Sequence, residues 1–309
     1  MKKAAFLSIL CLCVGLIGTA SAHIPEGVVR TAFQWPEGQN PTLDGNLSEW
    51  DLVPEDYSIG MDDGHLDAEG NADYDFADLN LRVIIGYSQS TEMIYFMMER
   101  FDDHYDRDGQ GGGAGGDDSW EVHIDGDHTG DTMRVRPDDI EDEDERQLAQ
   151  GRGAQAYHTR FPPLGDTGGD SWTWFWMSAA TWHTDSQFGD WGFSLDGDLN
   201  SGEATAFIEF SKVAWDDFLF TSAGESTIHD MVENEIIGLN WQVVDHDGNG
   251  PDATVDKNWY LSGATDSWRT AASATDFLLA PIDPRVDFSM IPSAVEAESW
   301  GRIKAVFVQ

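Results

Sequence analysis

Five short segments of the chain have the pattern of β-strands, and in most of them apolar and polar residues alternate. In the clearest of them, residues 120–124, three apolar residues are separated by Glu121 and His123. A period of two places alternate side chains on opposite faces of a β-strand, so each segment predicts a strand with one buried face. The five segments are 79–83, 93–97, 120–124, 206–210 and 239–243, and weaker strand patterns cover 171–184, 189–195 and 257–262.

Turns rich in Gly, Asp and Asn separate these segments. Short strands with such turns predict an all-β fold, namely an antiparallel β-sandwich of the immunoglobulin or jelly-roll kind. The Gly-rich stretch 109–116 and the acidic run 138–145 predict two long loops. Strand patterns on both sides of these loops fit one sheet system, so residues 23–290 are expected to form a single domain.

Helical patterns are few. Residues 211–220 predict a short helix with Ser211 as its N-cap. Ser293 and Glu296 have the spacing of a capping box, and an amphipathic pattern follows, so residues 291–309 predict a short C-terminal helix or tail. Such a helix either packs on the domain or provides a surface for self-association.

Acidic residues strongly outnumber basic ones. The chain has 57 Asp and Glu residues against 17 Lys and Arg residues, a formal net charge of −40 at pH 7. A surface with this charge repels nucleic acid and anionic lipid, so neither is an expected partner. Carboxylates within turns are also ligands that Ca²⁺ prefers, so the spacing of acidic residues in a turn can indicate a calcium site.

The N-terminus has the pattern of a secretory signal peptide. Two lysines precede an apolar run over residues 4–18, and an A-x-A cleavage site ends at Ala22. We therefore expect residues 1–22 to be removed and the mature protein to be secreted, either extracellular or periplasmic. Both cysteines lie within this segment, so the mature chain is expected to have no disulfide. No other segment is long and apolar enough to predict membrane insertion.

The segment 245–256, DHDGNGPDATVD, has the spacing of a calcium-binding loop. A calcium sensor needs a helix before such a loop, but the alternating segment 239–243 predicts a strand there. The loop therefore predicts a structural calcium site, and the alternative is an Asx-rich turn without metal. A weaker second candidate follows the strand pattern 120–124. The candidate ligands are Asp245, Asp247, Asn249 and Asp256 in the first loop, and Asp125 and Asp127 in the second.

Tryptophan is abundant, with 13 residues in the chain. Trp172, Trp174 and Trp176 alternate along one segment, so they share a face of the predicted strand. If the residues between them fill the core, the three indoles form an outward platform on which sugar rings can stack. The alternative is that the indoles themselves are the core. Trp182 and Trp191 are further candidates for contact with a sugar.

Five stretches of the chain, in the same order, resemble family 9 carbohydrate-binding modules and their DOMON-like relatives. Residues 41–50 match the opening x-DG-x-x-x-E-W, and residues 93–103 resemble the strand that ends in Asp-Asp. Residues 117–125 are similar to the family's D-s-v-E-l-f-i-D strand. Residues 206–211 and 237–247 are similar to two later strands, although Phe-Ser stands where the family often has Pro.

The resemblance implies a β-sandwich that binds polysaccharide or oligosaccharide through aromatic side chains and carries structural Ca²⁺. It also implies an association with carbohydrate catabolism. No catalytic motif is found, so the protein is expected to be non-catalytic. One alternative is an extracellular structural or surface-assembly protein. A second alternative is a haem-binding redox domain of the DOMON-like branch, with Met97 or Met98 as a candidate ligand beside a histidine.

Overall fold

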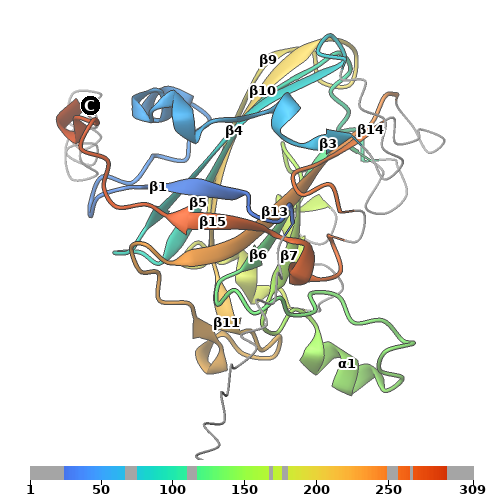
Figure 1. Ribbon diagram of the computed structural model, residues 1–309. Coiled ribbons are helices and arrows are strands. Elements are labelled where there is room, and N and C mark those ends of the chain that lie inside the picture. The colour runs from blue at the N-terminus through green and yellow to red at the C-terminus, as the bar shows by residue number, and fades with distance from the viewer. Residues whose placement is uncertain are drawn as a thin grey trace, which may run out of the picture.

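The strands form one large curled sheet with few helices (Figure 1), which confirms the predicted all-β fold. Among the described residues, no helix is long and apolar enough to span a membrane. The computed structural model describes residues 24–66, 75–109, 117–166, 170–175, 180–248, 257–264 and 267–290.

The first layer of the sandwich is built around β13, which lies next to β6 on one side. On its other side, β13 pairs first with β15 and then with β14. The layer consists of β8 (Thr173–Phe175), β7 (Gln155–Thr159), β6 (Ser119–Asp125), β13 (Ile236–Asp245), β15 (Thr275–Leu279), β14 (Lys257–Tyr260) and β3 (His65–Leu66).

The second layer contains the longest uninterrupted antiparallel pairings, between β4, β5 and β10. Its strands are β2 (Ile59–Gly60), β4 (Leu79–Ser88), β5 (Met93–Asp102), β10 (Ala204–Val213) and β9 (Trp191–Gly197). The remaining elements are β11 (Trp215–Asp217), β12 (Thr227–Ile228), the α-helix α1 (Glu143–Ala149) and short 3-10 helices at Leu47–Leu52, Glu55–Tyr57, Met61–Asp63, Trp182–Thr184, Ala223–Glu225, Ala271–Ser273 and Phe288–Met290.

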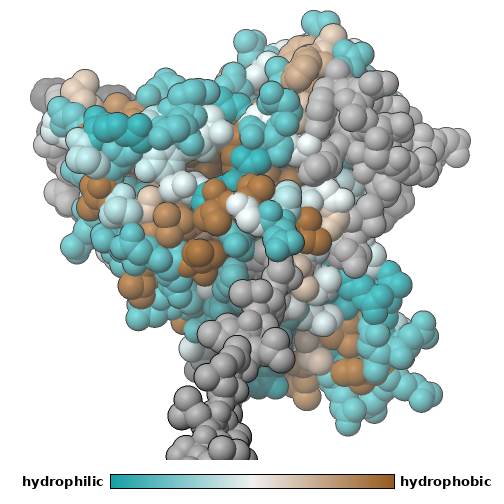
Figure 2. Space-filling model, viewed as in Figure 1, coloured by the Kyte–Doolittle hydropathy of each residue, from teal (hydrophilic) through white to brown (hydrophobic). Residues whose placement is uncertain are grey.

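The strand β1 (Val29–Gln34) joins the two layers. Its first four residues pair with β15 of the first layer, and its last two pair with β4 of the second. Both pairings are parallel, whereas the neighbouring pairings within the two layers are antiparallel as predicted. Apolar residues are visible over β1 and β15 in Figure 2, on a face that is otherwise largely hydrophilic, and Val29 is 49% exposed.

The main core lies between the two layers. Trp120 of β6 meets Phe96 of β5 and Phe210 of β10 edge to face, with ring centroids 5.9 and 5.1 Å apart. Trp241 of β13 lies 6.2 Å from Trp120 within the same cluster. The apolar positions of the alternating segments therefore do face one shared core, as their period of two predicted.

A second apolar cluster covers the outer face of β4 and β5, and its polar centre is the buried Glu209. The indole Nε1 of Trp50 donates to one Glu209 oxygen at 2.7 Å, and the backbone N–H of Gly45 donates to the other at 2.9 Å. Gly45 has φ +79° and lies against the Phe193 backbone, where an added Cβ would be 2.3 Å from a carbonyl carbon. Glu209 thus anchors the N-terminal segment on the outer face of the second layer.

Two sequence predictions of secondary structure are wrong. The expected helix over 211–220 is absent, because Ser211 to Val213 stay in register with β5 and β11 follows at once. The acidic run 138–145 is not only a loop, as expected, because its last three residues form the first turn of α1. The N-cap of this helix, Asp142, accepts a hydrogen bond from the Glu145 N–H at 2.9 Å. The expected signal peptide, most of the Gly-rich stretch and the C-terminal helix lie outside the described residues.

We expect Glu209→Ala to lower the free energy of unfolding by about 3 kcal/mol, because it leaves the buried donors of Trp50 and Gly45 without an acceptor. Urea denaturation followed by tryptophan fluorescence measures the change. Glu203→Ala, which removes an exposed carboxylate next to the same strand, is the control and should change stability by less than about 0.5 kcal/mol. Equal effects of the two substitutions would contradict the anchoring role of Glu209.

Candidate functional site

A buried ion cluster lies where β5, β6 and β13 end. Arg100 of β5 bonds Asp102 at 2.5 Å, Asp118 at 2.7 Å and Asp245 of β13 at 3.3 Å. All four side chains are at most 1% exposed. Burial raises the pKa of Asp118 well above its ordinary value, and Arg100 acts in the opposite direction. One guanidinium thus compensates three carboxylates that come from both layers of the sandwich.

The two leading residues of the expected calcium loop separate in the structure. Asp245 faces Arg100, whereas Asp247 groups with Asp78 and Asp103, whose carboxylate oxygens lie within 4.8 Å of one another. The other two expected ligands, Asn249 and Asp256, lie outside the described residues. Three carboxylates from three separate segments form a set of hard oxygen donors of the kind that suits Ca²⁺.

A further acidic group, Asp106, Asp108 and Asp117, lies nearby. Asp117 pairs with Arg107, so protein cations already balance part of its charge. Burial raises the pKa of Asp106 to about 6, and the negative charges of Asp108 and Asp117 add to this. Of the three acidic groups, the one with Asp247 is the candidate for an added cation, because it contains an expected ligand and its carboxylates are the most exposed of the three groups.

The second expected metal loop closes on its own backbone. Asp125 is 1% exposed and accepts from the Thr129 N–H at 3.3 Å and from the Gly130 N–H at 2.9 Å. Asp127 accepts from the Thr129 hydroxyl at 2.7 Å. Burial raises the pKa of Asp127, and the adjacent Asp125 carboxylate contributes to this. These bonds favour the Asx-rich turn that the sequence offered as the alternative to a metal site.

The expected tryptophan platform is divided between core and surface. Trp172 is only 7% exposed and packs on Phe161 and Phe210 in the main core, so it has no free face for a ligand. Trp182 stacks on Phe218 with ring centroids 4.8 Å apart, and its Nε1 donates to the Phe220 carbonyl. Trp176 lies outside the described residues. The predicted outward platform of three indoles is therefore wrong for Trp172, because this residue lies in a bend before β8 and packs into the core.

Trp174 is the expected residue that lies on the other face of the sheet. It is half-buried, between Thr173 and Phe175, which point into the core. One face of its indole stacks on the His158 ring with centroids 4.6 Å apart and an interplanar angle of 11°. The guanidinium of Arg160 lies 5.1 Å from the ring centroid. This tryptophan is therefore fixed in orientation while part of it stays open to solvent.

His158 belongs to a row of side chains that crosses the first layer. The paired positions are Trp174 on β8, His158 on β7, Glu121 on β6 and Gln242 on β13. Directly paired residues of antiparallel strands share a face, so all four lie on the face away from the core. His158 Nδ1 lies 2.7 Å from a Glu121 oxygen, and the Gln242 amide donates to the other oxygen. Hydrogen bonds and one ring stack therefore connect the whole row.

Glu121 is the charged centre of this row and is 4% exposed. Burial acts to raise its pKa, but the hydrogen bond and charge of His158 bring the pKa below its ordinary value. Burial lowers the pKa of the adjacent His123 to about 4, so that ring is neutral at pH 7. Among the described residues, neither His123 nitrogen has a hydrogen-bond partner, although the side chain is 1% exposed.

A further part of the chain covers the neighbouring area of this outer face. Met133 and Ala271 pack on Ala156, which occupies the position opposite His123. This packing brings Trp268 close to the row, and the guanidinium carbons of Arg134 and Arg136 lie 4.6 and 4.9 Å from its ring centroid. The charge of Arg134 also acts on Glu121. We call Trp174, Trp268, Arg134, Arg136 and Arg160, together with the buried row beneath them, the tryptophan–arginine face.

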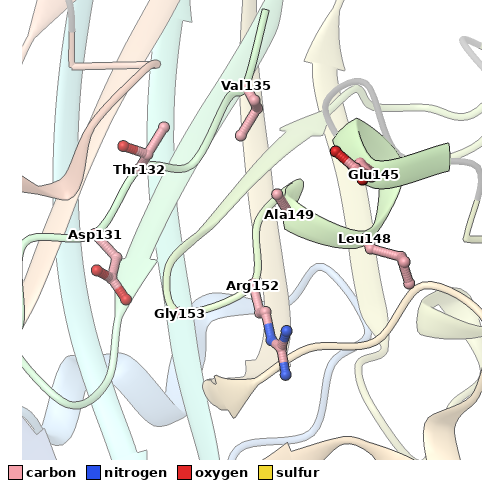
Figure 3. Close-up of a pocket in the computed structure, with 8 residues that line it drawn as sticks. All are labelled: Asp131, Thr132, Val135, Glu145, Leu148, Ala149, Arg152 and Gly153. Atoms are coloured by element: carbon pink, nitrogen blue, oxygen red, sulfur yellow. The ribbon is translucent and has the colours of Figure 1, made fainter. Parts of the chain in front are cut away.

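A pocket of about 450 Å³ lies on the other side of the segment that carries these arginines. Val135 lines it, between Arg134 and Arg136 in the sequence, and α1 forms the opposite wall (Figure 3). Its lining includes Arg152, which pairs with Asp217 at 2.6 Å. The eight lining residues are Asp131, Thr132, Val135, Glu145, Leu148, Ala149, Arg152 and Gly153.

Sequence reasoning did not predict the role of Glu121, His158, Arg134 and Trp268. The alternation in 120–124 did contain a signal, because Glu121 and His123 occupy the face opposite the apolar residues. Arg134 and Trp268 gave no such signal, since the bridge between Thr132 and Thr270 brings them together from distant parts of the chain. Met97 and Met98 are fully buried in two apolar clusters, which is ordinary core packing.

Three solved structures are similar to this chain. Two are a family 9 carbohydrate-binding module from Caldicellulosiruptor kristjanssonii, in complex with cellotriose and with glucose. Their TM-scores are 0.49 and 0.47, with 11% and 9% identity, covering 82% and 84% of this chain and 100% and 98% of theirs. The third, with TM-score 0.36 and 7% identity, is described as a putative carbohydrate-binding protein from Bacteroides uniformis and covers 81% of this chain and 98% of its own.

The family that the sequence motifs resemble is thus the family of two of these structures. No protein family model matches the chain, and no curated protein matches it.

We expect Arg100→Met to lower the free energy of unfolding by about 3 to 5 kcal/mol, because three buried carboxylates lose the guanidinium that they share. Thermal and urea unfolding measure this loss. Arg82→Met is the matched control on the adjacent strand: its half-exposed pair with Glu99, at 3.5 Å, is worth at most about 1 kcal/mol. If Arg100→Met is no more destabilising than Arg82→Met, the ion cluster does not hold the layers together.

Proposed function

We propose that this chain is a non-catalytic carbohydrate-binding protein and that the tryptophan–arginine face is its binding surface. The observation that carries the proposal is the half-buried indole of Trp174, fixed by stacking on His158 at the end of a buried polar row. Flat aromatic faces bind the apolar C–H faces of sugar rings, and nearby polar groups then select the hydroxyl pattern.

The buried row and the residues above it have different roles in this proposal. Glu121 holds the imidazole of His158, and His158 holds the indole of Trp174, so the stacking surface is ordered before a ligand arrives. Such preorganisation improves affinity because little side-chain entropy is lost on binding. Guanidinium donors lie beside this arrangement, since Arg160 donates to His158 Nε2 at 3.3 Å and the charge of Arg134 acts on Glu121. Polysaccharides and oligosaccharides therefore fit the face as ligands.

We also propose that structural Ca²⁺ stabilises the fold through Asp78, Asp103 and Asp247. The ion would supply positive charge among three carboxylates that lie within 4.8 Å of one another. The backbone near these residues is already tied to the ion cluster, since the His246 N–H donates to Asp118 at 2.9 Å and the His104 N–H donates to Asp102 at 2.9 Å. A bound cation would therefore stabilise the strand ends beside Arg100.

Secretion is part of the proposal and rests on the signal-peptide pattern over residues 1–22. A secreted protein with a sugar-binding face and no catalytic motif fits a role beside enzymes of carbohydrate catabolism.

We expect Trp174→Ala to weaken binding to the best ligand on a glycan array by about tenfold or more, since loss of an aromatic contact and its buried area removes about 1.5 kcal/mol. Isothermal calorimetry with that ligand measures the change. Phe76→Ala, which removes a 51% exposed aromatic ring outside the face, should bind as the unmodified protein does. Absence of binding to every glycan on the array would refute carbohydrate binding itself.

Removal of Ca²⁺ with EDTA should lower the melting temperature, because an ion bound only to the folded state stabilises it by about 2.7 kcal/mol at 100 times its Kd. The variant Asp247→Ala should melt lower than the unmodified protein in Ca²⁺ and should no longer respond to EDTA. Asp127→Ala is the control and should keep the response, because its turn closes through Thr129. A melting curve that EDTA leaves unchanged would exclude the structural calcium site.

A further inference from the structure

Arginines gather on the tryptophan–arginine face of a chain whose net charge is −40. Arg134 and Arg136 both lie over Trp268, and Arg160 lies over Trp174. Burial lowers the pKa of Arg134, and the positive charges of Arg136 and Arg269 lower it further. The guanidiniums of Arg134, Arg136 and Arg269 are therefore close enough to repel one another. This group of positive charges lies in a chain that has 57 acidic residues.

Arg160 pairs with Asp117 at 3.5 Å, and two further carboxylates near these arginines also bind other groups. Asp139 accepts two bonds from Arg269, at 3.0 and 3.1 Å, and Glu121 is shared by His158 and Gln242. In the described part of the chain, no carboxylate lies within 4 Å of the Arg136 guanidinium, which rests on the Trp268 ring instead. Arg136 is also only half-buried, so its donors face a surface that a ligand can reach.

Guanidinium groups provide paired N–H donors whose spacing matches a carboxylate or sulfate, and stacking on an aromatic ring fixes the direction of those donors. Repulsion between clustered arginines is relieved when an anion binds between them. Trp174 lies on β8 and Glu121, which Arg134 approaches, lies on β6, so stacking and charged subsites are about 10 Å apart across two strand spacings. A short oligosaccharide can therefore contact both.

We infer that the saccharide bound on this face is anionic, with one sugar ring on Trp174 and the carboxylate or sulfate of another at Arg134 and Arg136. This inference rests on the proposed carbohydrate-binding function and specifies its ligand. A neutral sugar would use the tryptophan but would gain no charge-assisted hydrogen bond from the guanidiniums.

The test compares three ligands of equal length by calorimetry with the full mature chain: a neutral gluco-oligosaccharide, an oligouronate and a sulfated oligosaccharide. We expect at least one anionic ligand to bind about tenfold tighter than the neutral one, and the two anionic ligands distinguish carboxylate from sulfate. Arg136→Gln should weaken binding of the preferred anionic ligand by about tenfold. Arg30→Gln, which removes a distant pair with Asp63, should keep the preference.

Equal affinities for neutral and anionic ligands would overturn the inference and leave carbohydrate binding intact. Loss of the anionic preference in Arg30→Gln, or its retention in Arg136→Gln, would also overturn it. If none of the three ligands binds and no glycan on the array binds, the proposed function itself is refuted. Melting temperatures of both variants show that a loss of affinity is not a loss of fold.

Discussion

The ion cluster around Arg100 is the constraint on which the arrangement of the strand ends in the sandwich depends. A guanidinium and three carboxylates cannot be buried unless each finds its partners, so the ends of β5, β6 and β13 must meet in one arrangement. The same cluster orders the adjoining loops, because Asp118 accepts the backbone N–H groups of Asp106 and His246 at 2.7 and 2.9 Å. The acidic group proposed for Ca²⁺ begins one or two residues further along these segments.

Polar residues on the outer face of the first layer fix the orientation of Trp174 and do not themselves form the proposed surface for ligand contact. Glu121, His158 and Gln242 are tied together by hydrogen bonds, and the half-buried Trp174 rests on them. A buried network of this kind fixes side-chain orientation because each member would lose hydrogen bonds by moving. The surface above it combines aromatic rings with guanidiniums, and that combination suits a charged sugar.

The strands with strict alternation could be predicted because each has one face in the core and one face that is not apolar. The strand β7 was not predicted, because all five of its residues are buried and its sequence does not alternate between apolar and polar residues. Strand-end aspartates could be recognised from spacing, but the spacing did not show that Asp245 faces an arginine from β5. Trp268 and Arg134 could not be paired from the sequence, because a tertiary contact between residues 132 and 270 creates their relation.

The position of β1 has a consequence for how the chain folds. Its pairing with β4 involves residues about 50 positions apart, but its pairing with β15 must await a strand that begins at Thr275. The first layer is therefore complete only after the chain has been made as far as β15. Topologies with such distant contacts fold slowly, because a large loop must close before the contact forms. During that interval the high negative charge favours solubility and so protects the open sandwich from aggregation.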